Sequence, residues 1–408
     1  MRILISHPNH PAQFRRLLPE LVSHGHDVVF LAKANEWHAP EVQGYRLLAY
    51  GEHRGGGGPH IHPYLRRLES AVLQGQACYR SACSLKEQGW SPDVVISHVG
   101  FGNGLYLRDL FPDARRIALF EWYYNAEGSD LAFLQPEGVS DDQRLRLRGW
   151  NAQILLELAE VDLAVTPTRW QLQQFPAWMH SRFRVIHEGV DTALMQPLRV
   201  SPQQSRPFGL PQGQDVEVVT YLSRCFEEYR GFPQAMRALA ILQKQRPNVH
   251  VVLVGSDEIA YGQPRVDGRS WREWAMQELD LDPVRTHWLG MLQNDAYLQL
   301  LACSDVHFYL TVPFVLSWSL LEAMAAGCAI VASRTEPVLE VMEDGVSGLL
   351  ADFWDEDEQV SSIAALLEDP PLRRRLGEAA QKAASKYSAA EGTRQWLGLL
   401  SEDTDQTA

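Results

Sequence analysis

The chain has 408 residues, of which 45% are hydrophobic and 22% are charged. At roughly 100–200 residues per domain, this length excludes a single small domain, and the average composition excludes extensive disorder. Residues 1–198 carry 19 Lys+Arg against 21 Asp+Glu, and residues 199–408 carry 18 against 30, giving −2 and −12 of the total charge of −14. Neither half is basic, which argues against a general nucleic-acid-binding protein.

The five cysteines are odd in number and scattered, with no CxxC or Cys/His ligand spacing; they are Cys78, Cys83, Cys225, Cys303 and Cys328. This pattern is typical of a reducing compartment. The N-terminal apolar run breaks too early for a signal peptide, and no stretch approaches the ~18 apolar residues of a membrane span. We therefore expect a cytoplasmic protein.

Short β-branched runs alternate with helical patterns along both halves of the chain. Runs that are apolar on both faces are typical of parallel strands covered by helices. In the first half they lie at residues 2–6, 27–31, 94–98, 117–120, 163–166 and 184–187. In the second half they lie at residues 216–222, 249–255, 286–289, 306–310 and 329–332. The pattern predicts an α/β fold with two doubly wound, Rossmann-like domains.

Residues 198–215 separate the two sets of strands. They are rich in Pro, Gln and Ser and lack apolar periodicity, so they predict an interdomain linker. We place an N-terminal domain at 1–198 and a C-terminal domain at 199–385. Residues 386–408 form a last segment, a helix followed by a polar tail.

Two familiar ligand motifs are absent from the first half. Residues 51–63 contain four consecutive glycines, but no Gly-Lys-Ser/Thr follows them, so a P-loop is excluded. His60 and His62 in this segment lack an evident third ligand, and we favour a loop over a metal site. The first strand is not followed by Gly-x-Gly-x-x-Gly, which argues against a nicotinamide dehydrogenase.

Two arginines follow the first strand of the second half, in the segment Tyr221-Leu-Ser-Arg224-Cys-Phe-Glu-Glu-Tyr-Arg230-Gly-Phe. This segment precedes a helix that is predicted to end near Gln245. Two guanidinium groups beside a helix N-terminus can converge on a diphosphate, because each offers a fork of donors and the helix end adds partial positive charge. The alternative interpretation is a pair of solvated surface arginines.

A second candidate segment is the helix predicted at residues 316–327, Leu-Ser-Trp-Ser-Leu-Leu-Glu-Ala-Met-Ala-Ala-Gly. Its apolar residues recur at helical spacing, and Gly327 marks its end. Because the helix follows a strand, its N-terminus should lie at the carboxyl edge of the sheet, where α/β proteins bind ligands. Glu322 on this helix is either an acceptor for ribose hydroxyls or an ordinary helix carboxylate.

In order and spacing, these segments resemble the GT-B glycosyltransferases, specifically the retaining family 4 type. The resemblance covers nearly the whole chain. It is carried by the initial Met-Arg-Ile-Leu, by His187-Glu-Gly-Val-Asp191, by the Arg224/Arg230 segment, by Val254-Gly255, and by Leu-Glu-Ala-Met-Ala-Ala-Gly with Asp344-Gly-Val-Ser-Gly348 behind it. The opening His7-Pro-Asn-His-Pro-Ala-Gln-Phe14 is similar to a branch that begins His-Gln-Asn-Phe-Pro-Gly-Gln-Phe. This resemblance implies two Rossmann-like domains facing across a cleft, with the C-terminal helix crossing back to the N-terminal domain.

The resemblance also implies roles for residues of the second domain. Arg224 and Arg230 match the Arg and Lys that hold the donor diphosphate in the family, although Arg replaces Lys and the gap is one residue longer. Glu322 matches the second Glu of the family's E-x7-E pair, which contacts ribose. The first Glu of that pair is missing, because Phe314 stands in its place. The other residues expected at the donor are Gly255, Ser256, Leu316 and Ser317.

In the first domain, the expected site residues follow strand ends. Glu121 stands where related enzymes often carry a cleft-facing His. A carboxylate there can accept a hydroxyl proton or balance oxocarbenium charge; the alternative is a capped polar strand end. By the same resemblance, we expect the substrate to contact Asn9, Gln13 and Phe14. The glycine-rich segment that begins at His98 follows a strand and can also approach the substrate; the alternative is a set of turn-forming glycines.

A group of arginines has two interpretations, one of which is contact with a membrane. Arg144, Arg146 and Arg148 alternate in the sequence near Arg115 and Arg116, and such a patch can meet anionic lipid or a lipid-linked glycan. Alternating arginines are more typical of a solvated helix face, which is the interpretation we favour. Peripheral contact with the inner membrane face stays the alternative.

Together these features predict a metal-independent glycosyltransferase that moves a sugar from a nucleoside-diphosphate sugar to a hydroxyl of a glycan, lipid-linked sugar or small acceptor, with retention of configuration. Arg224, Arg230, Glu322 and Glu121 are the predicted catalytic residues. We expect no metal and no cofactor besides the nucleotide-sugar co-substrate, and no nucleic-acid partner. The alternatives are a non-hydrolysing nucleotide-sugar epimerase and a non-catalytic nucleotide-sugar-binding protein.

Overall fold

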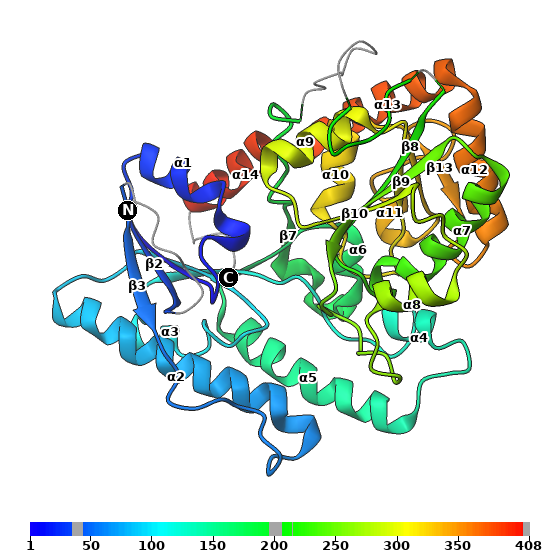
Figure 1. Ribbon diagram of the computed structural model, residues 1–408. Helices are drawn as coiled ribbons and strands as arrows, with labels where there is room; N and C mark the ends of the chain where they lie inside the picture. The colour runs from blue at the N-terminus through cyan, green and yellow to red at the C-terminus, as the bar shows by residue number, and fades with distance from the viewer. Residues whose placement is uncertain (35–43, 196–205, 214, 403–408) are drawn as a thin grey trace. The chain divides into compact units, whose positions relative to one another are not determined.

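A computed structural model of the chain describes residues 1–34, 44–195, 206–213 and 215–402. It divides into two compact units (Figure 1). Unit 1 comprises Met1–Gly189 together with Ala389–Ala408, and unit 2 comprises Val190–Ser388. The sequence predicted breaks after residues 198 and 385. Part of the predicted linker, residues 198–205 and 214, lies outside the described residues.

Unit 1 is built on a parallel sheet in the order β3-β2-β1-β4-β5-β6-β7. Its strands are β1 (Arg2–Ser6), β2 (Asp27–Lys33), β3 (Arg46–Tyr50), β4 (Val94–His98), β5 (Arg115–Leu119), β6 (Leu163–Thr166) and β7 (Phe183–Val185). Side chains alternate between the two faces of the sheet: Ile3 and Ile5 of β1 join one apolar cluster, whereas Leu4 joins another on the opposite face. Both faces must therefore be covered by helices.

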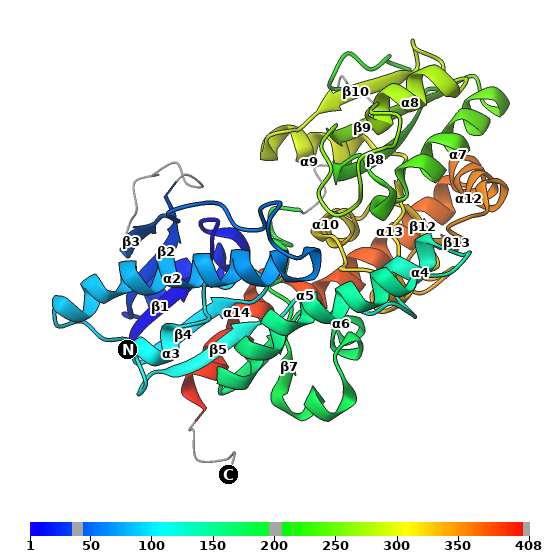
Figure 2. The same cartoon turned by 90° about the horizontal axis from the view of Figure 1, so that it is seen from below.

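The helices of unit 1 are α1 (Leu17–Ser23), α2 (Arg66–Glu87), α3 (Leu107–Leu110), α4 (Asp130–Leu134), α5 (Asp141–Glu160), α6 (Arg169–Gln174) and α14 (Ala389–Ser401). The short 3-10 helix η1 (Ala12–Phe14) precedes α1. Helices α1 and α14 cover one face of the sheet, and α2, α3 and α5 cover the other. Figure 2 shows α2 and α5 beside this sheet. A capping box of Ser140 and Gln143 fixes the start of α5.

Unit 2 has a second parallel sheet in the order β10-β9-β8-β11-β12-β13. The strands are β8 (Glu217–Cys225), β9 (Val249–Ser256), β10 (Thr286–Gly290), β11 (Val306–Tyr309), β12 (Ile330–Ser333) and β13 (Leu349–Ala351). Strands β8 and β11 lie at the centre of this sheet. The chain adds β9 and β10 beside β8, and it adds β12 and β13 beside β11. Such a switch point opens a ligand site at the carboxyl ends of the strands.

The helices of unit 2 are α7 (Phe232–Gln245), α8 (Trp271–Glu278), α9 (Asn294–Cys303), α10 (Trp318–Ala325), α11 (Glu336–Leu339), α12 (Glu356–Glu368) and α13 (Pro370–Ala384). Helices α9, α10 and α13 bury their apolar residues in one core with the sheet. Helices α7 and α12 pack against each other and against the strands. The 3-10 turn η4 (Glu228–Arg230) leads into α7 through Gly231.

The predicted α/β fold is confirmed, with two differences in its elements. Two strands were missed, β3 and β13, and each lies at the edge of its sheet. The helix predicted at 316–327 is shorter, because α10 begins at Trp318 with Ser317 as its N-cap. The helix predicted to end near Gln245 is confirmed as α7. None of the helices in the described part of the chain is long and apolar enough to cross a bilayer.

Candidate functional site

Arg230 is a buried cation at the carboxyl edge of the unit 2 sheet. Only 8% of the residue is exposed. Its Nη1 donates to the Thr311 hydroxyl at 2.9 Å and to the Val315 carbonyl at 3.0 Å, which accounts for only part of the donor fork. Among the described residues it forms no ion pair, and its Nε and Nη2 donate to no protein atom. A buried charge is normally paired, so this geometry suits an anionic ligand.

Arg224 lies on the same edge but in a different environment. The sequence placed it on a loop, whereas it stands near the end of β8, where a register shift interrupts the pairing with β9. Its side chain is exposed, and among the described residues it has no ion-pair partner. The two predicted diphosphate ligands therefore differ: Arg230 is fixed by its contacts, and Arg224 is held by none.

The N-terminus of α10 opens at the same edge. The Ser317 hydroxyl accepts the Ser319 N–H at 3.3 Å, and the Ser317 N–H donates to the Tyr309 hydroxyl at 3.2 Å. Leu316 is buried in the core at 5% exposure. Glu322, on the same helix, accepts a hydrogen bond from the Tyr297 hydroxyl at 2.9 Å. Burial together with this carboxylate raises the pKa of Tyr297 well above its usual value.

Glycines allow the loops at this edge to approach one another closely. A Cβ on Gly255 would come within 2.7 Å of the Phe226 ring and of the Ser223 carbonyl. A Cβ on Gly231 would come within 2.5 Å of the Leu310 Cβ. Ser256 is half-buried, and its hydroxyl approaches the Cys225 sulfur at 3.5 Å. No larger residue fits at either glycine without displacing its neighbours.

Phe314, which replaces the expected Glu, packs among aromatic rings that sequence reasoning missed. Its ring lies edge-on to Tyr229 at 5.1 Å and to Tyr261 at 5.0 Å. Tyr261 belongs to the loop after β9, and Glu227 holds this loop: its Oε2 accepts the N–H groups of Ala260, Tyr261 and Gly262 at 2.9–3.1 Å. No strand or helix pattern in the sequence would have indicated this contact.

Unit 1 gathers polar side chains at the ends of three adjacent strands. His7 follows β1, His98 ends β4, and Glu121 follows β5. The His98 Nε2 lies 3.4 Å from one Glu121 oxygen, and Gln13 Nε2 donates to the other at 2.8 Å. The rings of His7 and His98 meet edge to face at 4.9 Å. We name these four residues the polar cluster.

Two members of the polar cluster, Glu121 and His7, have lowered pKa values. Burial by itself would raise the pKa of Glu121, but His98, Gln13 and His7 outweigh burial, so its pKa falls to about 2. Burial, reinforced by His98, lowers the pKa of His7 to about 3. At neutral pH, Glu121 is therefore an ionised carboxylate and His7 is a neutral imidazole.

The remaining residues expected in this domain lie around the polar cluster. The backbone of Asn9 contacts the His7 ring: the Asn9 N–H and the Asn9 carbonyl both lie within 2.9 Å of His7 Nδ1. Phe14 is buried at 2% exposure and packs against Trp396 of α14. Gln13, His98 and Glu121 thus lie together in the structure, and the Phe14 ring lies in the core. Contact of these residues with substrate stays a prediction.

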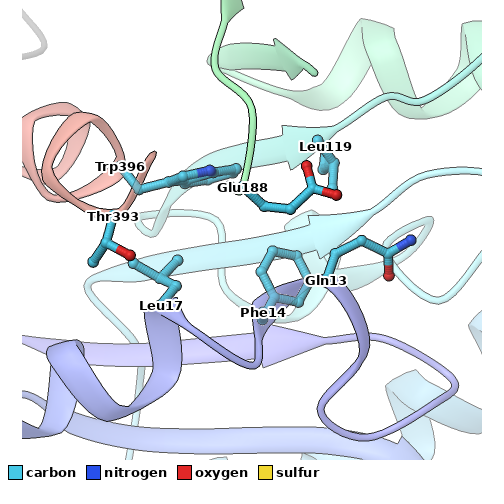
Figure 3. Close-up of a pocket in the computed structure, with 7 residues that line it drawn as sticks. All are labelled: Gln13, Phe14, Leu17, Leu119, Glu188, Thr393 and Trp396. Atoms are coloured by element: carbon cyan, nitrogen blue, oxygen red, sulfur yellow. The ribbon is translucent and has the colours of Figure 1, made fainter. Parts of the chain in front are cut away.

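A small cavity of about 10 Å³ borders Gln13 on its core side. Figure 3 shows its lining, to which η1, α1, β5 and α14 contribute; the residues are Gln13, Phe14, Leu17, Leu119, Glu188, Thr393 and Trp396. This volume accommodates about one water molecule. The cavity is too small for a sugar.

Two buried charged side chains, Arg116 and Glu157, lie beside the glycine-rich turn after His98, and the sequence gave no sign of them. Arg116 and Glu157 are 1% and 0% exposed. Arg116 donates to the Gly104 carbonyl at 2.7 Å, and Glu157 lies so close to Gly104 that a Cβ there would come within 2.8 Å of its oxygen. Burial raises the pKa of Glu157 to about 7, against the opposing effects of Gln153 and Arg116.

The predicted arginine patch is largely paired within unit 1. Arg144 pairs with Glu127, and Arg146 pairs with Asp142 one helical turn away. Arg115 donates to carbonyls at the end of α14, and Arg116 is buried. These contacts favour the solvated or structural interpretation of the arginines over a lipid patch.

Comparisons with known proteins agree with this architecture. A model described as glycosyl transferase family 4 group matches residues 24–195, and one described as glycosyl transferases group 1 matches residues 203–383. The D-inositol 3-phosphate glycosyltransferase of Nocardioides sp. is 28% identical over 365 residues, 83% of this chain and 75% of that protein. The enzyme of the same name from Corynebacterium efficiens is 28% identical over 230 residues, 55% of this chain and 51% of that protein. The alignments thus span between half and three quarters of these relatives.

Solved structures share the fold along the whole chain. The Anabaena protein HepE, solved in complex with UDP and glucose, has a TM-score of 0.69 and 19% identity, and the match covers 99% of this chain and 100% of that one. Both halves of the chain match glycosyltransferase models in the expected order, and the two parallel-sheet units share the fold of HepE. The chain belongs to the family 4 glycosyltransferases of GT-B fold.

Proposed function

We propose that this enzyme transfers a sugar from a nucleoside-diphosphate sugar to a hydroxyl group, with retention of configuration. The observation that carries the proposal is Arg230, a buried guanidinium with part of its donor fork directed to no protein acceptor. It stands beside the N-terminus of α10 at the carboxyl edge of the sheet. That HepE was solved with UDP and UDP-glucose supports a nucleotide-sugar donor.

The reaction breaks the bond between the anomeric carbon and the diphosphate oxygen, which leaves with the electron pair. The acceptor oxygen forms the new bond to the anomeric carbon. Its proton passes to a phosphate oxygen of the leaving group, as retention by front-face attack requires. Arg230 and the positive end of α10 stabilise the charge that develops on the diphosphate. Arg224 adds a second, exposed cation, and Glu322 binds the ribose.

We assign the acceptor to unit 1, where Glu121 supplies the charged group. A general base works best when its pKa lies near the working pH. With a pKa of about 2, Glu121 is better suited to orient an acceptor hydroxyl than to remove a proton. His98 and Gln13 hold its two oxygens in place.

The test is release of nucleoside diphosphate from a panel of donors, namely UDP-glucose, UDP-N-acetylglucosamine and GDP-mannose. Because the relatives are named for inositol phosphate, we would offer D-inositol 3-phosphate and myo-inositol first, followed by glycan and lipid-linked acceptors. Release that depends on an acceptor supports the proposal. Conversion of donor without acceptor would indicate an epimerase, and binding without turnover would indicate a nucleotide-sugar-binding protein.

A further inference from the structure

The backbone of Thr311, just after β11, is held by two buried hydroxyl groups from the end of the neighbouring strand β12. The Thr311 N–H donates to the Ser333 hydroxyl at 3.0 Å. The Thr311 carbonyl accepts from the hydroxyls of Ser333 at 3.0 Å and of Thr335 at 3.1 Å. Ser333 is the last residue of β12, and Thr335 is the N-cap of α11. Both polar groups of the Thr311 backbone are therefore fixed.

The side chain of Thr311 presents an oxygen lone pair to Arg230. The Arg230 Nη1 donates to this hydroxyl oxygen at 2.9 Å. Because a guanidinium group only donates, the proton of the hydroxyl must be directed elsewhere. The carbonyls of Val312 at 3.2 Å and of Tyr229 at 3.4 Å are its acceptors. The Thr311 oxygen is thus oriented to accept from the guanidinium.

Two further contacts hold Arg230 at the carboxyl edge of the sheet. The Val315 carbonyl accepts from the same Nη1 at 3.0 Å, and the hydroxyl of the buried Tyr221 donates to the Arg230 carbonyl at 2.7 Å. A guanidinium is planar, so two acceptors on one terminal nitrogen fix the direction of its other donors. Within the described part of the chain, Thr311 is the only residue whose side chain accepts a hydrogen bond from this guanidinium.

We propose that Thr311 is a positioning residue of the diphosphate site: its hydroxyl orients the Arg230 guanidinium, and Ser333 holds Thr311 in place. This inference rests on the function proposed above, in which Arg230 binds the diphosphate. A cation that is ordered before its ligand arrives loses little conformational freedom on binding. Without the Thr311 hydroxyl, Arg230 keeps its charge, but the ligand itself must order the side chain.

Calorimetric titration of Thr311→Val tests this inference. The probe is whichever of UDP, GDP, ADP and dTDP binds the wild type. The substitution removes the hydroxyl and nearly keeps the shape of the side chain. We expect it to weaken binding of the diphosphate about 10-fold, because one hydrogen bond that orders a charged group is lost. Thr311→Ser keeps the hydroxyl and should bind the diphosphate as the wild type does.

Thr286→Val is the matched control. Thr286 is a buried threonine that begins β10, so it lies at the amino edge of the same sheet, away from Arg230. Its hydroxyl bonds the side chain of Gln243, so this variant also loses a buried hydrogen bond. It should leave the affinity for the diphosphate unchanged.

A double-mutant cycle separates positioning from a general structural loss. If Thr311 acts through Arg230, Thr311→Val should change the affinity by less than about 2-fold in an Arg230→Met background. Ser333→Ala, which leaves Thr311 and Thr335 in place, provides a second route if Thr311→Val does not fold. We expect it to weaken binding about 3-fold in the wild type and to have no effect in Arg230→Met.

The outcomes separate this inference from the proposed function. Wild-type affinity in Thr311→Val or, where that variant does not fold, in Ser333→Ala would overturn the inference. So would equal losses in Thr311→Val and Thr286→Val, or an undiminished loss in the Arg230→Met background. If none of the four diphosphates binds the wild type, the proposed function fails together with the inference. If binding depends on Arg230 but not on Thr311, only the inference fails.

Discussion

Single residues define the chemistry of both candidate sites, and the clearest case in unit 1 is Glu121. One of its oxygens accepts a hydrogen bond from Gln13 and the other lies 3.4 Å from His98 Nε2, so side chains from two other segments set its position. We predict that Glu121→Gln lowers kcat about 100-fold, because the variant keeps the shape but loses the charge. The measurement is steady-state turnover with the donor and acceptor identified by nucleotide release. Glu160→Gln, on an exposed carboxylate of α5, is the control, and turnover of Glu121→Gln equal to this control would refute the role of Glu121.

His307 on β11 should make stability depend on pH. It is fully buried, its Nδ1 bonds the Thr220 hydroxyl at 2.9 Å, and burial lowers its pKa to about 3. Below about pH 6.5 the unfolded chain binds a proton on this ring that the folded protein does not, so the free energy of unfolding falls as pH drops through the window from about 6.5 to about 3. We expect a loss of about 2 kcal/mol at about pH 5 relative to about pH 8 from this residue.

Urea unfolding of the wild type and of His307→Asn at these two pH values isolates the contribution of His307. The substitution lowers stability at both, but it should remove that part of the pH dependence. An identical difference between the two pH values in both proteins would show that His307 does not titrate as described.

At this scale, the sequence could indicate residues but not their partners. Glu121, Gln13 and His98 were predicted because each follows a strand or matches a family segment. His7 occupies the same kind of position, yet its role depends on contact with His98 across the sheet edge. Glu157 and Tyr261 come from a helix and a long loop, so only folding brings them to the site. The roles of Arg224, Arg230 and Glu322 stay predictions.

At the scale of elements, the turn between η4 and α7 depends on Gly231. Its φ of +61° lies in the left-handed region, and a Cβ would come within 2.5 Å of Leu310. Gly290 has a similar φ of +64° but open space around it. We predict that Gly231→Ala destabilises the protein by at least about 2 kcal/mol more than Gly290→Ala, because only the first adds a clash to the backbone strain. Chemical unfolding of the two variants measures this difference, and equal losses would mean that the turn can relax.

Strand prediction succeeded where both faces of a strand are buried. The central strands, such as β4 and β11, are buried at every position and consist mostly of apolar residues. The edge strand β3 contains exposed and half-buried residues, and β13 has only three residues, so neither carries that pattern. The ends of α10 were misplaced because Leu316 and Ser317 continue the helical spacing, although Ser317 acts as the cap.

At the scale of the whole chain, the C-terminal helix belongs to the first unit. Trp396, Leu399 and Leu400 of α14 join the core that contains Phe14 and Leu17. The resemblance implied this return of the chain, which composition and periodicity alone do not show. The unit boundary at Gly189 also required the structure, because the bridge between Val190 and Ser388 already belongs to unit 2.

We predict that Trp396→Ala destabilises the protein by about 3–5 kcal/mol, as expected when a large side chain is removed from a core. Trp396 is 3% exposed, whereas Trp178 is 76% exposed, so Trp178→Ala is the matched control and should change stability by less than about 0.5 kcal/mol. Differential scanning calorimetry measures both. Similar melting temperatures for the two variants would contradict the place of α14 in the core of unit 1.

The central claim is that Arg230 binds the diphosphate of a nucleotide sugar. Calorimetric titration of UDP, GDP, ADP and dTDP into the wild type, Arg230→Met and Arg237→Met tests it most directly. Arg237 lies on α7 and pairs with Glu356, so it controls for loss of a cation from the same unit. We predict that at least one diphosphate binds the wild type and Arg237→Met alike, and that it binds Arg230→Met about 10- to 150-fold more weakly, as loss of a charge-assisted contact implies. Equal affinity in the wild type and in a folded Arg230→Met protein would contradict the account, as would the absence of binding by all four nucleotides.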